Sequence, residues 1–322
     1  MEQSGTTMVE AIRMALSEVL TAHPSAVLLG TDIGAYGGPF RATAGLYDRF
    51  GAARVLDTPP NPAAILGFSR GLKLAGHLPV CELPPELALR ASGVLIDGVG
   101  RFEERTGQPG GPFVVRVPVG LVENGALADG DSPEGALAGV RGLRVVCPSR
   151  PVDAYAMLVG AASAANEPVV VLEPKALYRA YGPPLVVPAL DEILDTLHHA
   201  RRVRAGSDLV IIAWGAGVPV AVEAAQRMTS DGYEVGVLDA RVLSPLDLET
   251  LAAAVEETGR ALIVHDTGGA LASDVVRRLT ERCFLHLEAP VGLVSHAGHE
   301  LAPNREDWVR RVREAALGTL NF

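Results

Sequence analysis

Four carboxylates lie in segments where they could move a proton or bind a cation: Glu82, Glu86, Asp129 and Asp131. A positioned carboxyl group is a common general acid or base. Glu82 ends a predicted strand, and Glu86 follows a Pro-Pro pair at the start of a predicted helix, where acidic residues complement the helix dipole. A loop rich in Gly and Asp around Asp129 and Asp131 is typical of a turn. A structural role is favoured for all four carboxylates. Glu86 is kept as the alternative candidate for a general acid or base.

Three groups of residues contain histidines that could do chemistry: an adjacent histidine pair, a His-Asp pair and two histidines in one loop. His198-His199 sits at a predicted helix end, and its rings should point apart, which favours solvent exposure over metal binding. His265-Asp266 lies where a predicted strand meets a loop; a structural or interfacial role is favoured, with a catalytic dyad as the alternative. His296 and His299 have no third ligand nearby in sequence, so no metal site is predicted.

A glycine-rich loop over residues 30–38 suggests a phosphate cradle at first sight. It has neither the Lys-Ser/Thr pair of a P-loop nor the spacing of a dinucleotide fingerprint. We therefore interpret it as a backbone turn.

Composition narrows the function classes. The 322 residues carry a formal net charge of −10, which argues against a nucleic-acid partner, because such proteins present a basic face. Cys81, Cys147 and Cys283 have no metal-ligand or redox spacing, which fits a reducing compartment. No signal-peptide pattern or membrane-length apolar run is visible, so a cytoplasmic α/β protein without membrane association is expected.

Short apolar runs alternate with helical patterns along most of the chain, which indicates largely parallel sheets covered by helices on both faces. The first set of strands is predicted over residues 26–29, 54–56, 79–83, 113–117, 143–146 and 168–172. A Pro- and Gly-rich stretch then breaks the rhythm, and the alternation restarts near residue 208. We predict two doubly wound α/β domains, over residues 1–180 and 206–322, joined by a linker over residues 181–205.

Helix starts are the most specific local signals. Thr7 followed by Glu10 makes a capping box before a helical apolar pattern. Asn61 is a favoured N-cap, and Pro62 suits the first helical position because its missing N–H would be unpaired there. A helix over residues 63–75 is therefore predicted to begin directly after Asn61-Pro62.

Six motifs have an order and spacing that point to one family. They are L-L-G-T-D-I-G-A-Y-G-G-P-F-R-A-T (28–43), R-V-L-D-T-P (54–59), G-L-R-V-V-C-P-S (142–149), P-V-V-V-L-E-P-K-A-L-Y-R (168–179), V-L-D-A-R-V-L-S-P-L-D (237–247) and A-L-I-V-H-D (261–266). Over nearly its whole length the chain resembles the β subunit of the thiamine-diphosphate-dependent decarboxylase component of 2-oxo acid dehydrogenase complexes, of the pyruvate, branched-chain and acetoin types.

The resemblance implies a transketolase-like pyrimidine-binding domain followed by a smaller transketolase C-terminal domain. It also implies a heterotetramer with an α-type subunit, with thiamine diphosphate between an α and a β chain. In the family the α subunit holds the diphosphate through Mg²⁺, using Gly-Asp-Gly and a later Asn, a pair that this sequence lacks. Asp32, Pro62 and Pro85 are the pocket positions that the resemblance implies here.

Three positions depart from the family pattern. The glutamate that exchanges a proton with N1′ of the aminopyrimidine falls on Pro62, which has no titratable group. The aromatic ring expected after the strand at residues 79–83 falls on Pro85 or its neighbour, and the histidine expected before Ser132-Pro133-Glu134 falls on Asp129. Together they indicate a changed or abandoned active site.

Two functions follow as expectations. The first is a β-type subunit that, with an α subunit, decarboxylates a 2-oxo acid or takes a two-carbon ketol unit and passes the product to a lipoyl or carrier domain. The alternative is a catalytically degenerate β-like subunit that stabilises or regulates such an assembly. The resemblance favours the first; the substitutions at Pro62, Pro85 and Asp129 favour the second and leave the enzymatic status of the chain open.

Overall fold

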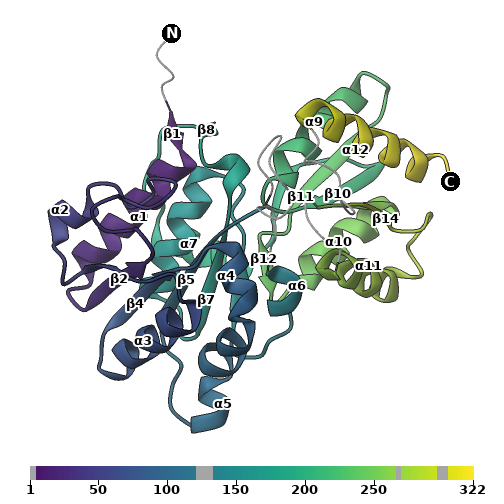
Figure 1. Cartoon of the computed structure of the whole chain (residues 1–322). Helices are drawn as coiled ribbons and strands as arrows, with labels where there is room; N and C mark the ends of the chain where they lie inside the picture. The colour runs from purple at the N-terminus through teal and green to yellow at the C-terminus, as the bar shows by residue number, and fades with distance from the viewer. Residues whose placement is uncertain (1–4, 121–132, 266–269, 296–303) are drawn as a thin grey trace.

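The structure is a computed structural model, and it describes residues 5–120, 133–265, 270–295 and 304–322. The chain forms two lobes side by side, each built on one twisted sheet with helices on both faces (Figure 1). This arrangement confirms the two α/β domains expected from the alternating pattern.

The first lobe contains a seven-stranded sheet in the order β12-β6-β7-β5-β4-β2-β3. Its strands are β2 (Ala26–Gly30), β3 (Val55–Asp57), β4 (Leu78–Glu82), β5 (Phe113–Val119), β6 (Arg144–Val146), β7 (Pro168–Pro174) and β12 (Val242–Ser244). All neighbours pair in parallel except β12, which runs antiparallel to β6. The order places β2 between β3 and β4, so three loops leave the sheet side by side at its carboxyl edge.

Helices cover this sheet on both faces because its strands are apolar on both. One core packs α1 (Met8–Ala22) and α7 (Pro151–Ser163) against alternate strand residues such as Leu28 and Val114. The other packs α3 (Pro62–Leu74), α4 (Pro85–Arg90) and the π-helical turn η1 (Val94–Gly100) against the intervening residues. The alternation follows from the two-residue period of a strand. Short elements complete the lobe: α2 (Leu46–Phe50), α5 (Phe102–Thr106), α6 (Glu134–Leu137) and η3 (Lys175–Leu177).

The first helix begins where the capping box predicts. The backbone N–H of Glu10 donates to Thr7 Oγ1 at 3.4 Å, and the backbone N–H of Thr7 donates to Glu10 Oε2 at 2.8 Å. These hydrogen bonds hold the pKa of Glu10 below its usual value. The helix then buries Ile12 and Leu16 against the sheet, as the helical spacing requires.

The second lobe contains a five-stranded sheet in the order β14-β13-β10-β11-β9. Its strands are β9 (Arg201–Arg204), β10 (Leu209–Ala213), β11 (Val235–Asp239), β13 (Ala261–His265) and β14 (Gly292–Ser295). One face is covered by α9 (Gly217–Thr229) and α12 (Arg305–Leu320), the other by α10 (Leu248–Thr258) and α11 (Ala270–Cys283). Because β9 pairs antiparallel to β11, the sheet is mostly rather than wholly parallel.

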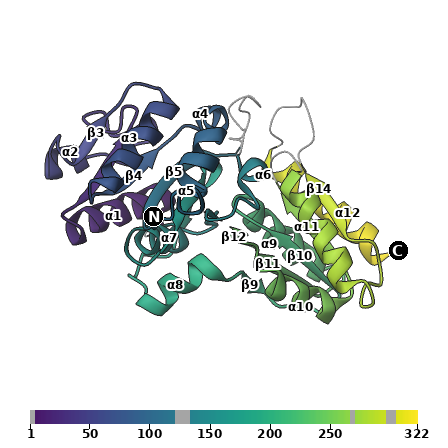
Figure 2. The ribbon, with the colours of Figure 1, turned by 90° about the horizontal axis from the view of Figure 1, so that it is seen from below.

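The connection between the lobes carries short structure of its own. A two-residue strand, β8 (Tyr181–Gly182), pairs with β1 (Thr6–Thr7), and α8 (Leu190–His198) packs against α7. The chain then enters the second sheet and returns at β12 to pair with β6 of the first. Figure 2 shows β9, β11 and β12 close to this junction. The boundaries 180 and 206 stay predictions, and β12 lies beyond them as part of the first sheet.

Candidate functional site

The carboxyl edge of the first sheet gathers the segments that the sequence marks for chemistry. Gly30 pairs with Asp57, and Leu29 pairs with Cys81, so β2, β3 and β4 end at nearly the same level. Ligands of open parallel sheets bind in the crevice outside these carboxyl ends. The loops that leave here are residues 31–45, 58–61 and 83–84.

Two of these loops are clamped together. The backbone N–H of Gly34 donates to Asp57 Oδ1 at 2.6 Å, and the N–H of Thr58 donates to the Gly30 carbonyl at 2.9 Å. A Cβ at position 34 would lie 2.4 Å from Asp57 Oδ2, which only glycine avoids. The glycine-rich loop is therefore a backbone turn held against the end of β3.

Asp32 is exposed within that turn. Its backbone has φ +58°, a left-handed conformation that Asp tolerates better than most residues, and its carbonyl accepts from the N–H of Gly38 at 2.8 Å. The structure thus brings this predicted pocket position to the carboxyl edge through its backbone. No hydrogen bond or ion pair of its carboxylate exists within the described residues.

Pro62 stands at the first position of α3, half-buried beside the same edge. Asn61 is the N-cap, and its Oδ1 accepts from the N–H of Ala64 at 3.1 Å. The predicted helix start is confirmed, and its reason is local: an amide cap followed by a residue that needs no N–H acceptor. Position 62 offers no proton to a ligand.

The remaining predicted site positions are only partly described. Pro85 and Glu86 open α4, directly after β4, and their side chains lie outside the described part of the structure. Asp129 and Asp131 fall in residues 121–132, which the structure does not describe. The same holds for Asp266, His296 and His299.

Two hydroxyls at this edge have unused hydrogen-bonding capacity. Thr31 follows β2 and Thr58 follows β3, one step beyond the Gly30–Asp57 pair, so the two residues are neighbours across the strands. Both Oγ1 atoms are buried and have no hydrogen-bond partner within the described residues. Buried polar atoms are nearly always satisfied in folded proteins, so an orphaned pair at a carboxyl edge fits a ligand or partner that supplies the missing bonds. Sequence reasoning did not find this pair, because any two threonines look ordinary.

Glu82 forms a buried ion pair and is not free to act on a ligand. Arg116 Nη1 lies 2.6 Å from Glu82 Oε2, while its Nε and Nη2 hold both oxygens of Glu173 at 2.7 and 2.9 Å. The Tyr178 hydroxyl donates to Glu173 at 2.7 Å. Burial raises the pKa of Glu82 and, more strongly, that of Tyr178, whereas the two carboxylates hold the pKa of Arg116 above its usual value against burial. We name these four residues the buried ion set; it supports the structural interpretation of Glu82.

The histidines of the sequence analysis lie in different environments: His198 and His199 are exposed, and His265 is buried. The rings of His198 and His199 lie 6.4 Å apart and tilted, and burial is the main cause that lowers the pKa of His198. Among the residues that the structure describes, no three His, Cys, Asp or Glu groups are placed to hold a metal. His265 is buried between the lobes: its Nε2 lies 2.7 Å from Glu134 Oε1, and its ring lies 4.4 Å from that of Trp214. That placement is interfacial, as expected.

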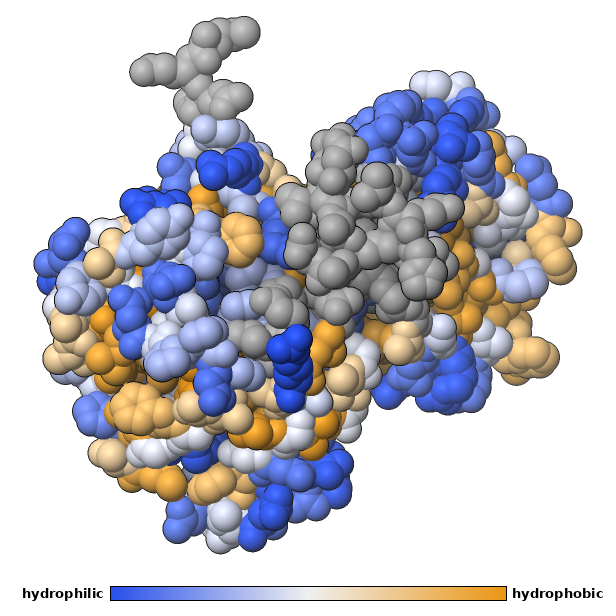
Figure 3. All heavy atoms as spheres, viewed as in Figure 1, coloured by the Kyte–Doolittle hydropathy of each residue, from blue (hydrophilic) through white to orange (hydrophobic). Residues whose placement is uncertain are grey.

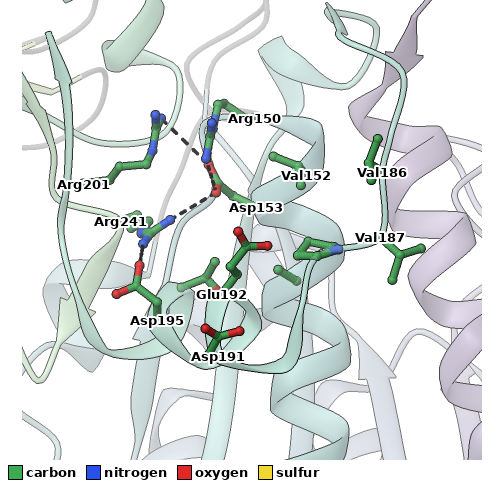
Figure 4. A pocket seen from close by; sticks show the side chains of 13 residues that line it. Arg150, Val152, Asp153, Val186, Val187, Asp191, Glu192, Asp195, Arg201 and Arg241 are labelled. Carbon is green, nitrogen blue, oxygen red and sulfur yellow. Dashed lines mark hydrogen bonds and ion pairs between the residues drawn. The ribbon is translucent and has the colours of Figure 1, made fainter.

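A second region of interest lies at the lobe junction, away from the carboxyl edge of β2 and β3. Arg150 and Asp153 at the start of α7, Asp195 of α8, Arg201 of β9 and Arg241 before β12 converge on one hollow (Figure 4). Arg241 bridges Asp153 and Asp195 at 3.1 and 2.5 Å. Sequence reasoning missed the cluster because its members come from four separated segments, and the one member inside a quoted motif, Arg241 in residues 237–247, is not marked there as a functional residue.

None of the described helices has an apolar run long enough to cross a bilayer.

Two family models match the chain. Residues 4–180 match the transketolase pyrimidine binding domain, and residues 198–304 match the transketolase C-terminal domain. The first match alone covers more than half of the chain.

Curated relatives match nearly end to end. The chain is 35% identical over 329 residues to the pyruvate dehydrogenase E1 component subunit beta of Staphylococcus aureus (strain Mu50 / ATCC 700699), covering 98% of this chain and 99% of that one. It is 36% identical over 298 residues to the protein of the same description from Leifsonia xyli subsp. xyli (strain CTCB07), covering 88% and 84%. A solved split-gene transketolase, described as an inactive beta4 tetramer, shares the fold with a TM-score of 0.74 at 20% identity over 99% of both chains.

Proposed function

The chain belongs to the transketolase-like family that contains the pyruvate dehydrogenase E1 β subunits, and from this premise we propose that it is the β-type subunit of a thiamine-diphosphate-dependent 2-oxo acid dehydrogenase. The observation that carries the proposal is the 35% identity over 98% of the chain. The proposed activity is decarboxylation of a 2-oxo acid together with an α-type subunit, in the cytoplasm. The proposed acceptor is a lipoyl or carrier domain.

The cofactor proposal rests on the carboxyl edge. Thiamine diphosphate supplies the carbanion-stabilising centre that decarboxylation requires. Thr31 and Thr58 offer two hydroxyls, without a hydrogen-bond partner among the residues described, where its pyrimidine would be held, and the Asp57–Gly34 clamp fixes the loops around them. These residues would bind and orient the ring. The diphosphate and Mg²⁺ are assigned to the α-type partner.

The acid that the family uses is proposed to be missing from this edge. Pro62 takes its place and starts α3, while Glu82 is committed to Arg116 at 2.6 Å. A proton exchanged with the cofactor therefore has to come from Glu86 or from the partner chain. Thr31, Thr58 and the Asp57–Gly34 clamp hold the ring and supply no proton to it.

The surface beside this edge supports an α-type partner. On α3, Gly67 and Gly71 face open space, and a Cβ at either position would meet nothing within 4 Å. Phe68 is 53% exposed and Leu74 59% exposed on the same helix. Figure 3 shows apolar residues on the face of the first lobe where α3 lies in Figure 1. Small residues allow close backbone approach, and exposed large apolar groups mark contact surfaces. We propose that the α-type subunit covers α3 and completes the cofactor site in a heterotetramer.

The test is to co-express the chain with the α-type subunit of its own genome. Thiamine diphosphate binding is measured by calorimetry on the chain alone and on the complex, and CO₂ release is measured with a panel of 2-oxo acids. We expect binding and CO₂ release from the complex and none from the chain alone. A purified complex that binds no thiamine diphosphate and releases no CO₂ from any 2-oxo acid would exclude this function and leave a degenerate subunit.

Two variants locate the acid in that complex. Pro62→Glu tests whether a carboxyl group at the start of α3 raises the rate of CO₂ release. Glu86→Gln tests whether Glu86 is the acid that exchanges the proton. We expect Pro62→Glu to fall short of full activity, because Pro85 and Asp129 also differ from the family. Loss of turnover in Glu86→Gln assigns the acid to this chain; unchanged turnover assigns it to the partner.

A further inference from the structure

The hollow at the lobe junction has a volume of about 700 Å³, within the range of ligand pockets, about 300–1,000 Å³. Its walls come from α7, from residues 186–188, from α8 and from the second lobe. It lies apart from the carboxyl edge of β2 and β3, and the proposed function assigns it nothing. A ligand in it would contact both lobes and the segment that joins them.

One wall offers unused hydrogen-bond donors. Arg150 gives Nε and Nη2 to Asp153, each at 2.8 Å, while 43% of its side chain is exposed. Its Nη1 has no hydrogen-bond partner in the part of the chain that the structure describes. Within the described residues Arg201 has two ion-pair contacts, both long, at 3.4 Å to Asp239 and 3.9 Å to Asp153, and burial is the main cause that lowers its pKa. A guanidinium has five N–H donors, so both arginines can still bind a carboxylate.

The start of α7 adds to this wall. No side chain caps the helix, and the first bonded N–H is that of Ala154, which donates to the Arg150 carbonyl. The N–H groups of Val152 and Asp153 have no acceptor among the described residues, and both residues line the hollow. Free N–H groups at a helix start favour an anion.

The opposite wall offers acceptors. Asp191 and Glu192 of α8 are exposed; Asp191 has no ion-pair partner among the described residues, and Glu192 gives one oxygen to the N–H of Ala189 at 3.1 Å. Figure 4 shows both acids across the hollow from Arg150 and Arg201. A simple anion would be attracted by one wall and repelled by the other, and a simple cation would meet the reverse.

The third wall is apolar. Val186 is 78% exposed and Val187 61% exposed, and both line the hollow with Val152 and Ala156. Exposed valines beside a charged cavity give an aliphatic group a place to leave water. The hollow therefore presents donors, acceptors and an apolar surface at three separate places.

We propose that this hollow binds a small zwitterion with an aliphatic side chain, of the aliphatic α-amino acid class. Its carboxylate binds Arg150 and Arg201, its ammonium faces Asp191 and Glu192, and its side chain lies on Val186 and Val187. The ligand links α7 to β9 across the junction, so its binding stabilises the two lobes in their present arrangement.

The test compares three probes on the purified full chain by calorimetry: L-valine, the 2-oxo acid with the same side chain, and isobutylamine. We expect L-valine to bind at least about tenfold more tightly than either probe, because each of these lacks one charge. Arg201→Gln and, separately, Asp191→Asn should each weaken L-valine binding about tenfold. Arg202→Gln is the matched control: Arg202 neighbours Arg201 on β9 but pairs with Glu257 at 2.6 Å and does not line the hollow.

Three results would overturn the proposal. They are no binding of L-valine at millimolar concentration by a folded chain, equal binding of L-valine and either single-charge probe, and equal weakening by Arg202→Gln. Circular dichroism confirms the folding of each variant, and Asp191→Asn decides the matter if Arg201→Gln does not fold, since Asp191 is an exposed helix residue. None of these readouts depends on thiamine diphosphate or turnover, so the proposal stands or fails apart from the proposed function.

Discussion

The carboxyl edge of β2 and β3 and the buried ion set lie one strand apart, yet they are built in opposite ways. At the edge a proline stands where acid–base chemistry is expected, and two buried hydroxyls have no hydrogen-bond partner among the described residues. The buried ion set joins Glu82, Arg116 and Glu173 by contacts of 2.6 to 2.9 Å in the buried interior. The comparison indicates that the buried charges of this lobe stabilise its fold. The hydroxyls at the edge are instead available to the proposed ligand and partner.

Removing the cation of the buried ion set should have the largest effect. Arg116→Met leaves two buried carboxylates without compensation, which costs about 3–5 kcal/mol of the free energy of unfolding. Urea denaturation of the variant and the parent measures it. Arg202→Gln breaks an exposed ion pair and should cost about 0–1 kcal/mol. Equal losses in the two variants would show that the buried ion set adds no cohesion.

The lobe junction adds a pH-dependent effect. Burial, and then the charge of Asp153, raises the pKa of Asp239 to about 6 from 3.8. The folded state therefore holds this proton more tightly than the unfolded chain, and the stability that it contributes is lost as pH rises from about 4 to 6. The loss is on the order of 3 kcal/mol. Asp239→Asn should remove this pH dependence. The free energy of unfolding of the variant relative to the parent should therefore increase as the pH rises. Parallel stability–pH curves for the two proteins would contradict this.

A smaller effect of opposite sign is expected at the carboxyl edge. Thr58→Val removes a buried hydroxyl for which the described structure holds no partner, so the isolated chain should gain about 1 kcal/mol. Thr43→Val is the matched control, because the Thr43 hydroxyl donates to the Ile33 carbonyl at 2.7 Å and should cost about 1 kcal/mol. Thermal unfolding measures both. A destabilised Thr58→Val would mean that its hydroxyl is already satisfied.

The helix start gives the smallest change. Asn61→Ala loses the hydrogen bond to the N–H of Ala64 and should cost about 0.5–1 kcal/mol, at the low end for an exposed cap. Asn61→Asp keeps an acceptor there and should cost nothing measurable. Thermal unfolding of these two variants separates the cap from a general effect of substitution. A cost in both would assign Asn61 another role.

Local signals in the sequence predicted much of the fold. The Thr7–Glu10 capping box and the Asn61-Pro62 start act within one helical turn, and both appear in the structure as expected. The main strands of the first sheet were predicted because buried parallel strands read as short apolar runs. β9 was read as linker, because Arg201–Arg204 is charged and becomes a strand only by pairing with β11.

The candidate site was less accessible to sequence reasoning. Positions 32, 62 and 85 were assigned through the family resemblance, and the structure places all three next to the carboxyl edge without testing their roles. The Thr31–Thr58 hydroxyl pair depends on strand register, and the hollow at the lobe junction depends on four segments meeting in space. Neither leaves a local pattern that spacing or composition could reveal.

The return of β12 to the first sheet bears on how the chain can be cut. Val242–Ser244 belong by sequence to the second lobe, yet they form a ladder on β6. A fragment that stops at residue 180 would leave β6 with bare backbone amides and carbonyls along its rim, a template for self-association. The two lobes are thus connected both by the segment after residue 180 and by the pairing of β12 with β6. We expect fragments of the first lobe to stay monodisperse only when residues 242–244 are supplied.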